Sequence, residues 1–238
     1  MSTFIQGFLD NDSFFGRTMN KAWIIIAANL TFLVFCIPVV TIGPAFTALY
    51  HVMLKTLRGD GQINPFKEFW IGFKSNIKQS ILCWLAFAAL LVVGYLDLRF
   101  CQQQGGMLDL FRYGIYAVGI IAILVFVYLQ PVMAAFADTI PHLMRNAIYF
   151  ICKKPLKTLV ILFFNVFPLY LTYTDLQMLP LYAFCWFFFG FGAVAMIGSS
   201  LLVKEFAPYL DPKEQEEGAD MDADEKAMLE DLRMMDGV

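Results

Sequence analysis

Residues 23–50, WIIIAANLTFLVFCIPVVTIGPAFTALY, contain no charged side chain in 28 consecutive positions. About 20 apolar residues are enough to span a bilayer as an α-helix. Pro38, Gly43 and Pro44 follow past the midpoint of the stretch. Because every backbone N–H and C=O in hydrocarbon must be paired within the protein, the pattern predicts a spanning helix that ends or kinks where protein surrounds it. The stretch therefore indicates a membrane protein.

The composition of the whole chain supports the same class. It is 59% hydrophobic and 16% charged, whereas soluble domains carry about 25% charged residues. The charge is divided unevenly, with a net charge of −8 in residues 211–238 and of +5 in residues 1–210. This division predicts a membrane domain over residues 1–210 and an acidic, partly disordered cytoplasmic tail over residues 211–238, with one short helix near residues 221–235.

The apolar runs predict an all-α fold, a polytopic membrane helix bundle of about five transmembrane helices with amphipathic interfacial helices. The runs long enough to cross a bilayer are residues 22–40, 80–96, 113–137, 158–173 and 179–203.

The lysine and arginine residues between these runs predict the orientation. Alternate sides carry 11 and 4 of them when residues 41–79 are taken as one loop. Cytoplasmic loops are enriched in these residues, so the count predicts an N-terminus outside and a C-terminus in the cytoplasm. A further span hidden in residues 44–55 would change this result. The basic residues lie in the loops between spans, which disfavours a nucleic-acid partner.

Residues 64–78 predict an amphipathic helix beside the second span. The apolar side chains that recur at helical spacing are Phe66, Phe69, Trp70, Phe73 and Ile77. Three lysines lie off this face, a pattern typical of a helix that binds the anionic inner leaflet of the lipid bilayer. The same face could instead pack within the protein or dock on a partner. Residues 144–154 repeat the pattern more weakly.

The chain lacks the motifs of catalysis, so no catalytic residue is assigned and we expect no enzyme activity. No P-loop, HExxH or GxSxG motif occurs. His51 and His142 have no second histidine or cysteine within one helical turn, and the five cysteines form no CxxC pair, so neither a metal nor a cofactor is expected. Asp138 and His142, four residues apart, could form either a functional pair or a capping interaction.

One block of residues is a candidate structural or interaction site. Its members are Asn29, Pro38, Thr41, Gly43, Pro44 and Tyr50. The run IPVVTIGPA followed by TALY resembles the signature of the YesL family of bacterial integral membrane proteins, and residues 1–210 match that family in layout. Asn29 and other neutral polar residues in the spans could bond one helix to another.

The resemblance implies a bacterial plasma-membrane protein of unclassified activity. Genes of the YesL family often accompany carbohydrate ABC importers and sensor kinases, which implies an accessory or regulatory role, with permease subunits or a sensor kinase as partners beside the lipid bilayer. Two other functions stay open from the residues. The broken region between Pro38 and Pro44 could serve a small transporter or channel, and the acidic tail could serve a membrane-anchored signalling adaptor.

Overall fold

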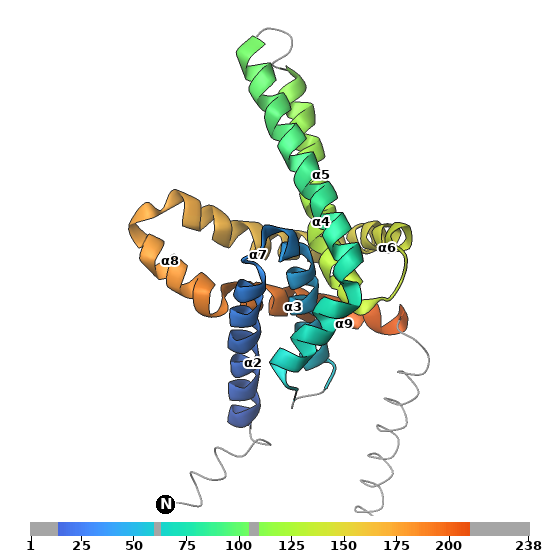
Figure 1. Ribbon diagram of the computed structural model, residues 1–238, viewed down its shortest axis with the longest axis vertical. Helices are drawn as coiled ribbons and strands as arrows, with labels where there is room; N and C mark the ends of the chain where they lie inside the picture. The colour runs from blue at the N-terminus through green and yellow to red at the C-terminus, as the bar shows by residue number, and fades with distance from the viewer. Residues whose placement is uncertain (1–13, 60–62, 105–109, 210–238) are drawn as a thin grey trace, which may run out of the picture. The chain divides into compact units, whose positions relative to one another are not determined.

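A computed structural model describes residues 14–59, 63–104 and 110–209 (Figure 1). Over these ranges the chain is helical and contains no β-strand, so the predicted all-α class is confirmed. The predictions for the acidic tail fall on residues 211–238, outside the described residues. The division of the chain into two domains at residue 210 therefore stays a prediction.

The first described residues form two helices joined by a tight turn. Helix α2 spans Phe14–Phe35, and a 3₁₀ turn, η1 (Val39–Thr41), leads into helix α3, Ile42–Leu57. Residues 41–79 were expected to form a loop with one amphipathic helix. The structure has a second helix in this range, α3, which was not expected. Pro44 lies in the first turn of α3, where a proline removes no hydrogen bond that the helix would otherwise make. This proline therefore begins a helix, whereas the sequence pattern suggested that it ended one.

Helix α4 is continuous over Pro65–Gln104, 40 residues, or about 60 Å at 1.5 Å per residue. It unites the amphipathic helix expected over residues 64–78 with the span expected over residues 80–96. Helix α5, Phe111–Ala135, follows and packs against α4. The residues that link the amphipathic helix to the span, near Ser80, have no glycine or proline, so nothing in the chain breaks the helix there.

The other helices that the structure describes lie in residues 140–209. Helix α6 covers Ile140–Lys153, and α7 covers Pro155–Thr174. The last apolar run is built from η3 (Leu176–Met178), α8 (Leu179–Cys185), the π-helix η4 (Trp186–Gly190), α9 (Phe191–Phe206) and η5 (Ala207–Tyr209).

Within the part of the chain that the structure describes, five helical segments are long and apolar enough to cross a membrane. They are Thr18–Phe35, Pro65–Gln103, Phe111–Ala135, Pro155–Thr174 and Leu176–Tyr209. Each contains most of one predicted run, so the prediction of five membrane-type helices is confirmed. Helix α3 has 16 residues and is not among them.

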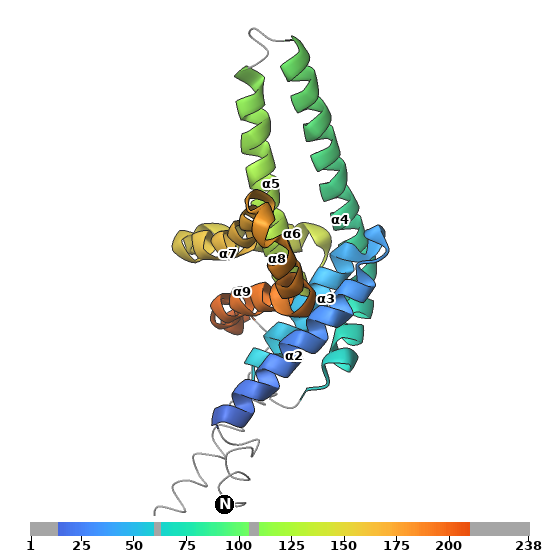
Figure 2. The same cartoon turned by 90° about the vertical axis from the view of Figure 1, so that its left-hand side faces the viewer.

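The main hydrophobic core lies where α2, α3 and the first half of α4 meet. Ala45, Leu49 and Met53 of α3 are fully buried against Ile24 and Phe32 of α2. In both views α2 and α3 lie side by side, with the start of α2 and the end of α3 at the same end of the pair (Figure 2). The short turn between them makes this pair a helical hairpin, and α4 packs along it.

Candidate functional site: the polar seam along helix α3

Helix α3 carries a line of polar side chains through the interior. Thr47, His51 and Lys55 recur every four residues and therefore share one face of the helix. This face meets α4 and α5. We define the polar seam as these three residues and the side chains opposite them, which are Glu68, Ser80 and Gln130.

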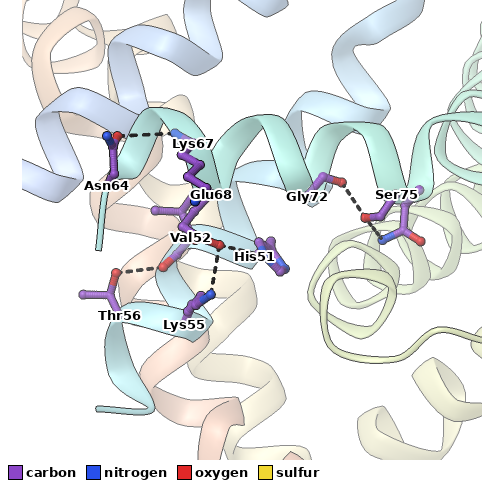
Figure 3. Close-up of polar contacts among 10 residues, drawn as sticks. His51, Val52, Lys55, Thr56, Asn64, Lys67, Glu68, Gly72 and Ser75 are labelled. Carbon is purple, nitrogen blue, oxygen red and sulfur yellow. Dashed lines mark hydrogen bonds and ion pairs between the residues drawn. The ribbon is translucent and has the colours of Figure 1, made fainter. Parts of the chain in front are cut away.

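A buried carboxylate organises one end of the polar seam. Glu68 Oε2 lies 3.1 Å from Lys55 Nζ and 3.6 Å from His51 Nε2. Figure 3 draws both contacts as dashed lines. The Glu68 side chain is only 11% exposed. A buried charge is costly unless it is paired, so Lys55 is the partner that allows this carboxylate to lie between α3 and α4. Figure 3 also shows His51 facing the α4 backbone near Gly72.

Gly72 provides the space that His51 occupies. A Cβ atom placed on Gly72 would lie 2.8 Å from His51 Cβ, which is closer than two such carbons can approach. The histidine therefore packs directly against the backbone of α4. Burial lowers the pKa of His51, and the Ala134 carbonyl and the Glu68 carboxylate oppose this shift only in part. The imidazole is consequently neutral at pH 7, and Lys55 and Glu68 form the ion pair.

The lowered pKa of His51 predicts a pH-dependent stability. The unfolded chain takes up this proton near pH 6.5, before the folded protein does, so folding stability falls as the pH drops through that value. We expect the melting temperature in detergent to decrease between about pH 7.5 and about pH 5.5, because the free energy of unfolding falls by at most about 1.4 kcal/mol per pH unit. His51→Gln should flatten the decrease, while the control His142→Gln, which alters the exposed histidine, should retain it. Equal slopes in both variants would contradict the assignment.

The other end of the polar seam is a chain of neutral hydrogen bonds. Thr47 Oγ1 donates to Gln130 Oε1 at 2.8 Å, and it lies 3.0 Å from Ser80 Oγ. Because the single hydroxyl proton of Thr47 is used toward Gln130, Ser80 is the donor in the second bond. Thr47 and Ser80 are fully buried. These bonds connect α3, α4 and α5 in one place.

Gly43 allows the close approach of α3 and α4 beside these bonds. A Cβ atom on Gly43 would lie 2.6 Å from both the Ser80 carbonyl oxygen and Trp84 Cβ. Real side chains do not fit such a space, so glycine is required there. Gly43 is a candidate residue of the sequence block, and its role in the structure is to join two helices.

Asn29 joins α2 to the π-helix η4 in the last apolar run. Its Nδ2 donates to the carbonyls of Phe187 at 2.7 Å and of Trp186 at 3.1 Å, and its Oδ1 accepts from Gly192 N–H at 2.9 Å. A π-helical turn disturbs the regular i→i−4 pairing of the backbone. The asparagine side chain pairs these backbone groups, so its place is between helices, as the prediction of a helix–helix bond suggested.

The other residues of the sequence block do not gather into one pocket. Thr41 Oγ1 lies 2.6 Å from the Phe35 carbonyl and 2.7 Å from the Pro38 carbonyl, at the exposed turn. Pro44 is buried in α3. Tyr50 is buried, and its hydroxyl lies 3.3 Å from the position that a Cβ on Gly198 would occupy. The structure thus divides the block between the turn and the bundle interior.

Part of the apolar face over residues 64–78 packs inside the protein, and part of it is exposed. Phe69 and Phe73 are buried, and their rings lie 5.3 Å and 4.8 Å from the ring of Phe35 in α2. Ile77 is half-buried. Phe66 and Trp70 are 54% and 55% exposed. Of the alternatives for this face, packing within the protein therefore accounts for Phe69 and Phe73.

Asp138 and His142 lie together, as their spacing predicts. Asp138 Oδ1 is 3.1 Å from His142 Nδ1, and it accepts the backbone N–H of Thr139 at 2.6 Å just before α6. The Thr139 N–H, and then His142, lower the pKa of Asp138. Both groups are exposed, so the pair acts at the start of a helix on the surface.

The sequence did not identify Glu68, the carboxylate of the polar seam, as a site residue. Glu68 lies 17 positions from His51 in the chain and on another helix, so no local spacing links the two residues. The signal was the spacing of Thr47, His51 and Lys55, which marks a polar face on an otherwise apolar segment. Among the residues described here, no three histidine, cysteine, aspartate or glutamate side chains gather as metal ligands.

Comparisons with known proteins find similarity to a family of unknown function over part of the chain. A family model described as "Protein of unknown function, DUF624" matches residues 25–98, which contain α3 and the first half of α4. The "Uncharacterized protein YteU" of Bacillus subtilis (strain 168) is 28% identical over 134 residues, covering 54% of this chain and 60% of that protein. The chain thus aligns with less than two thirds of the length of this relative. No solved structure matches the chain.

Proposed function

We propose that this chain is a non-enzymatic, multi-pass subunit of the bacterial plasma membrane that assembles with the permease of a carbohydrate ABC importer or with a sensor kinase. The observation that carries the proposal is that polar side chains in the interior form hydrogen bonds between helices. Thr47, Ser80 and Asn29 all bond one helix to another. A polar group that serves helix packing is not free to bind a substrate, so these groups support a structural role.

The surface grooves support the same proposal. A groove of about 800 Å³ lies between the second half of α4 and the first half of α5. Its walls are mostly apolar, with Asp97 and the two tyrosines, Tyr95 and Tyr116, as the exceptions. Val93, Val118 and Ile120 on these walls are exposed. A second groove, between α5 and α7, has apolar and aromatic walls. Such walls suit a transmembrane helix or an acyl chain and offer little to a sugar, which needs several hydrogen-bonding groups.

The partner class comes from the family resemblance. The matched family has no assigned function, and membership of the YesL family, with its carbohydrate-importer context, is part of this proposal. The C-terminus is proposed to lie in the cytoplasm. A transporter or channel remains the rival function, because grooves along spans can also accompany a pore formed by several copies.

Site-specific photo-crosslinking in native membranes would test the proposal. A photo-reactive residue at Val118 should form an adduct with an importer permease or a sensor kinase, identified by mass spectrometry. The same residue at Leu156, which is 78% exposed and lies outside both grooves, is the matched control and should form none. Sugar flux through the purified protein alone in liposomes, together with adducts only between copies of this chain, would reject the accessory role and favour the transporter.

A further inference from the structure

The turn between α2 and α3 exposes apolar side chains where turns normally carry polar ones. We define the hairpin tip as residues 36–41, CIPVVT. Ile37 is 78% exposed, Val39 66% and Val40 48%. Turns in contact with water favour glycine, proline, asparagine, aspartate and serine, and of these the hairpin tip has only Pro38. Its composition fits a hydrocarbon environment better than water.

Three backbone carbonyls in or beside the hairpin tip, those of Phe35, Pro38 and Val39, are paired within the protein. Thr41 Oγ1 lies within bonding distance of the Phe35 and Pro38 carbonyls, and Thr41 N–H donates to the Pro38 carbonyl at 3.0 Å. Trp84 Nε1 donates to the Val39 carbonyl at 2.9 Å. Pro38 itself has no N–H to satisfy. Internal pairing of this kind is what hydrocarbon demands of a non-helical backbone.

The position of Trp84 places the hairpin tip beside the apolar part of α4. No charged side chain occurs between Lys78 and Asp97, so the bilayer-crossing part of α4 begins after Lys78. Trp84 is six residues beyond Lys78, or about 9 Å along the helix. Lys74 and Lys78 are exposed on the part of α4 that packs along α3. Along α4, the hairpin tip therefore lies at the height of the start of the bilayer-crossing part. The rest of α3 lies at the height of the charged residues Lys74 and Lys78.

We propose that α2 and α3 form a re-entrant hairpin whose tip inserts among lipid acyl chains from the cytoplasmic face, and that neither helix crosses the bilayer. Helix α3 has 16 residues, or about 24 Å, which is shorter than the hydrocarbon core of about 30 Å. From Trp23 to the end of α2, only Trp23 and Val34 are exposed, so other helices cover most of the apolar surface that a lone span would present to lipid.

The charge distribution supports the cytoplasmic side. In a hairpin, the start of α2 lies on the same side as the end of α3 (Figure 2). Arg17 and Lys21 then join Lys55 and Arg58, and moving these two residues changes the split of lysine and arginine from 11 against 4 to 13 against 2. The larger asymmetry follows the positive-inside rule more closely. The hairpin therefore puts the start of α2 in the cytoplasm, whereas five crossings put it outside, and both place the C-terminus in the cytoplasm.

Cysteine labelling of intact cells separates the two topologies. In a background with the five native cysteines replaced, a membrane-impermeant maleimide should label Gln102→Cys and spare both Lys21→Cys and Arg58→Cys. The two spared positions, which are exposed, should react after permeabilisation. Labelling of Lys21→Cys in intact cells would overturn the proposal. The C-terminus is on the same side in both topologies, and the test does not depend on the proposed partners.

Depth-dependent quenching tests the lipid contact of the hairpin tip. The purified protein carries a fluorophore on Val39→Cys in vesicles of phosphatidylcholine and phosphatidylglycerol with brominated acyl chains. Quenching at Val39 should approach that at Leu90→Cys in the span and exceed that at Lys74→Cys by about twofold or more, because only groups in hydrocarbon meet the bromine atoms. Quenching at Val39 equal to that at Lys74 would overturn the proposal and would leave water or a protein partner as the neighbour of the tip.

Discussion

Gly43→Leu is expected to destabilise the folded protein by at least about 3 kcal/mol, because overpacking that forces backbone shifts costs 1–3 kcal/mol or more. The atoms that a side chain would meet at Gly43 are the Ser80 carbonyl oxygen and Trp84 Cβ, both at 2.6 Å. A backbone carbonyl cannot move aside as the end of a flexible side chain can. The substitution would therefore separate α3 from α4 and break the Thr47–Ser80 contact.

Thermal unfolding in detergent, followed by tryptophan fluorescence, would measure this effect. Gly119→Leu is the matched control, since it places the same side chain on helix α5 at a glycine with no atom within 4 Å of its Cβ position. It should change the stability by no more than about 1 kcal/mol, and in the stabilising direction, because leucine is a better helix former than glycine. Equal melting temperatures for the two variants would show that the α3–α4 contact at Gly43 is absent in the protein.

Asn29→Leu is expected to cost about 2–4 kcal/mol, because each buried polar group left without a partner costs about 1–3 kcal/mol and relaxation recovers part of that loss in membrane proteins. Leucine preserves the approximate size of the side chain but cannot bond to Phe187, Trp186 or Gly192. The loss would fall on the π-helix η4 and its packing on α2.

The comparison variant is Asn76→Leu. Asn76 Nδ2 makes one bond to another helix, to the Met133 carbonyl at 3.0 Å, so its loss should be about one third of that for Asn29→Leu. Hydrogen exchange at residues 186–192 should increase in the Asn29 variant alone. A smaller loss of stability for Asn29→Leu than for Asn76→Leu would argue against the pairing of Asn29 with the π-helix.

The Gly43→Leu and Asn29→Leu variants also distinguish a structural role of the sequence block from a functional one. If Asn29 and Gly43 act by joining helices, any loss of partner assembly should follow the loss of stability. A variant at either position that stays folded but no longer assembles with its partner would identify the block as an interaction site, and the accessory role would then depend on it directly.

The sequence alone determined the helical class and the membrane-type segments. Hydrophobicity and helix propensity depend on neighbouring residues, so residues 80–96 and 113–137 could be recognised without knowledge of the rest of the chain. The face formed by Phe69 and Phe73 was also visible, because its spacing is a local property. The sequence could not show that this face packs on Phe35, since packing, a partner and lipid all select the same residues.

Only the tertiary structure determined the conformation of residues 41–57 and the bonding partners of the interior polar groups. The sequence did not reveal helix α3, because glycine and proline, here Gly43 and Pro44, usually break helices. Only the close approach of Gly43 to the Ser80 carbonyl shows why a glycine is required at position 43. Asn29 and Gly192 are 163 positions apart, and Glu68 reaches His51 from another helix. Such pairs arise from the arrangement of helices in space, which the short-range periodicity of the chain does not record.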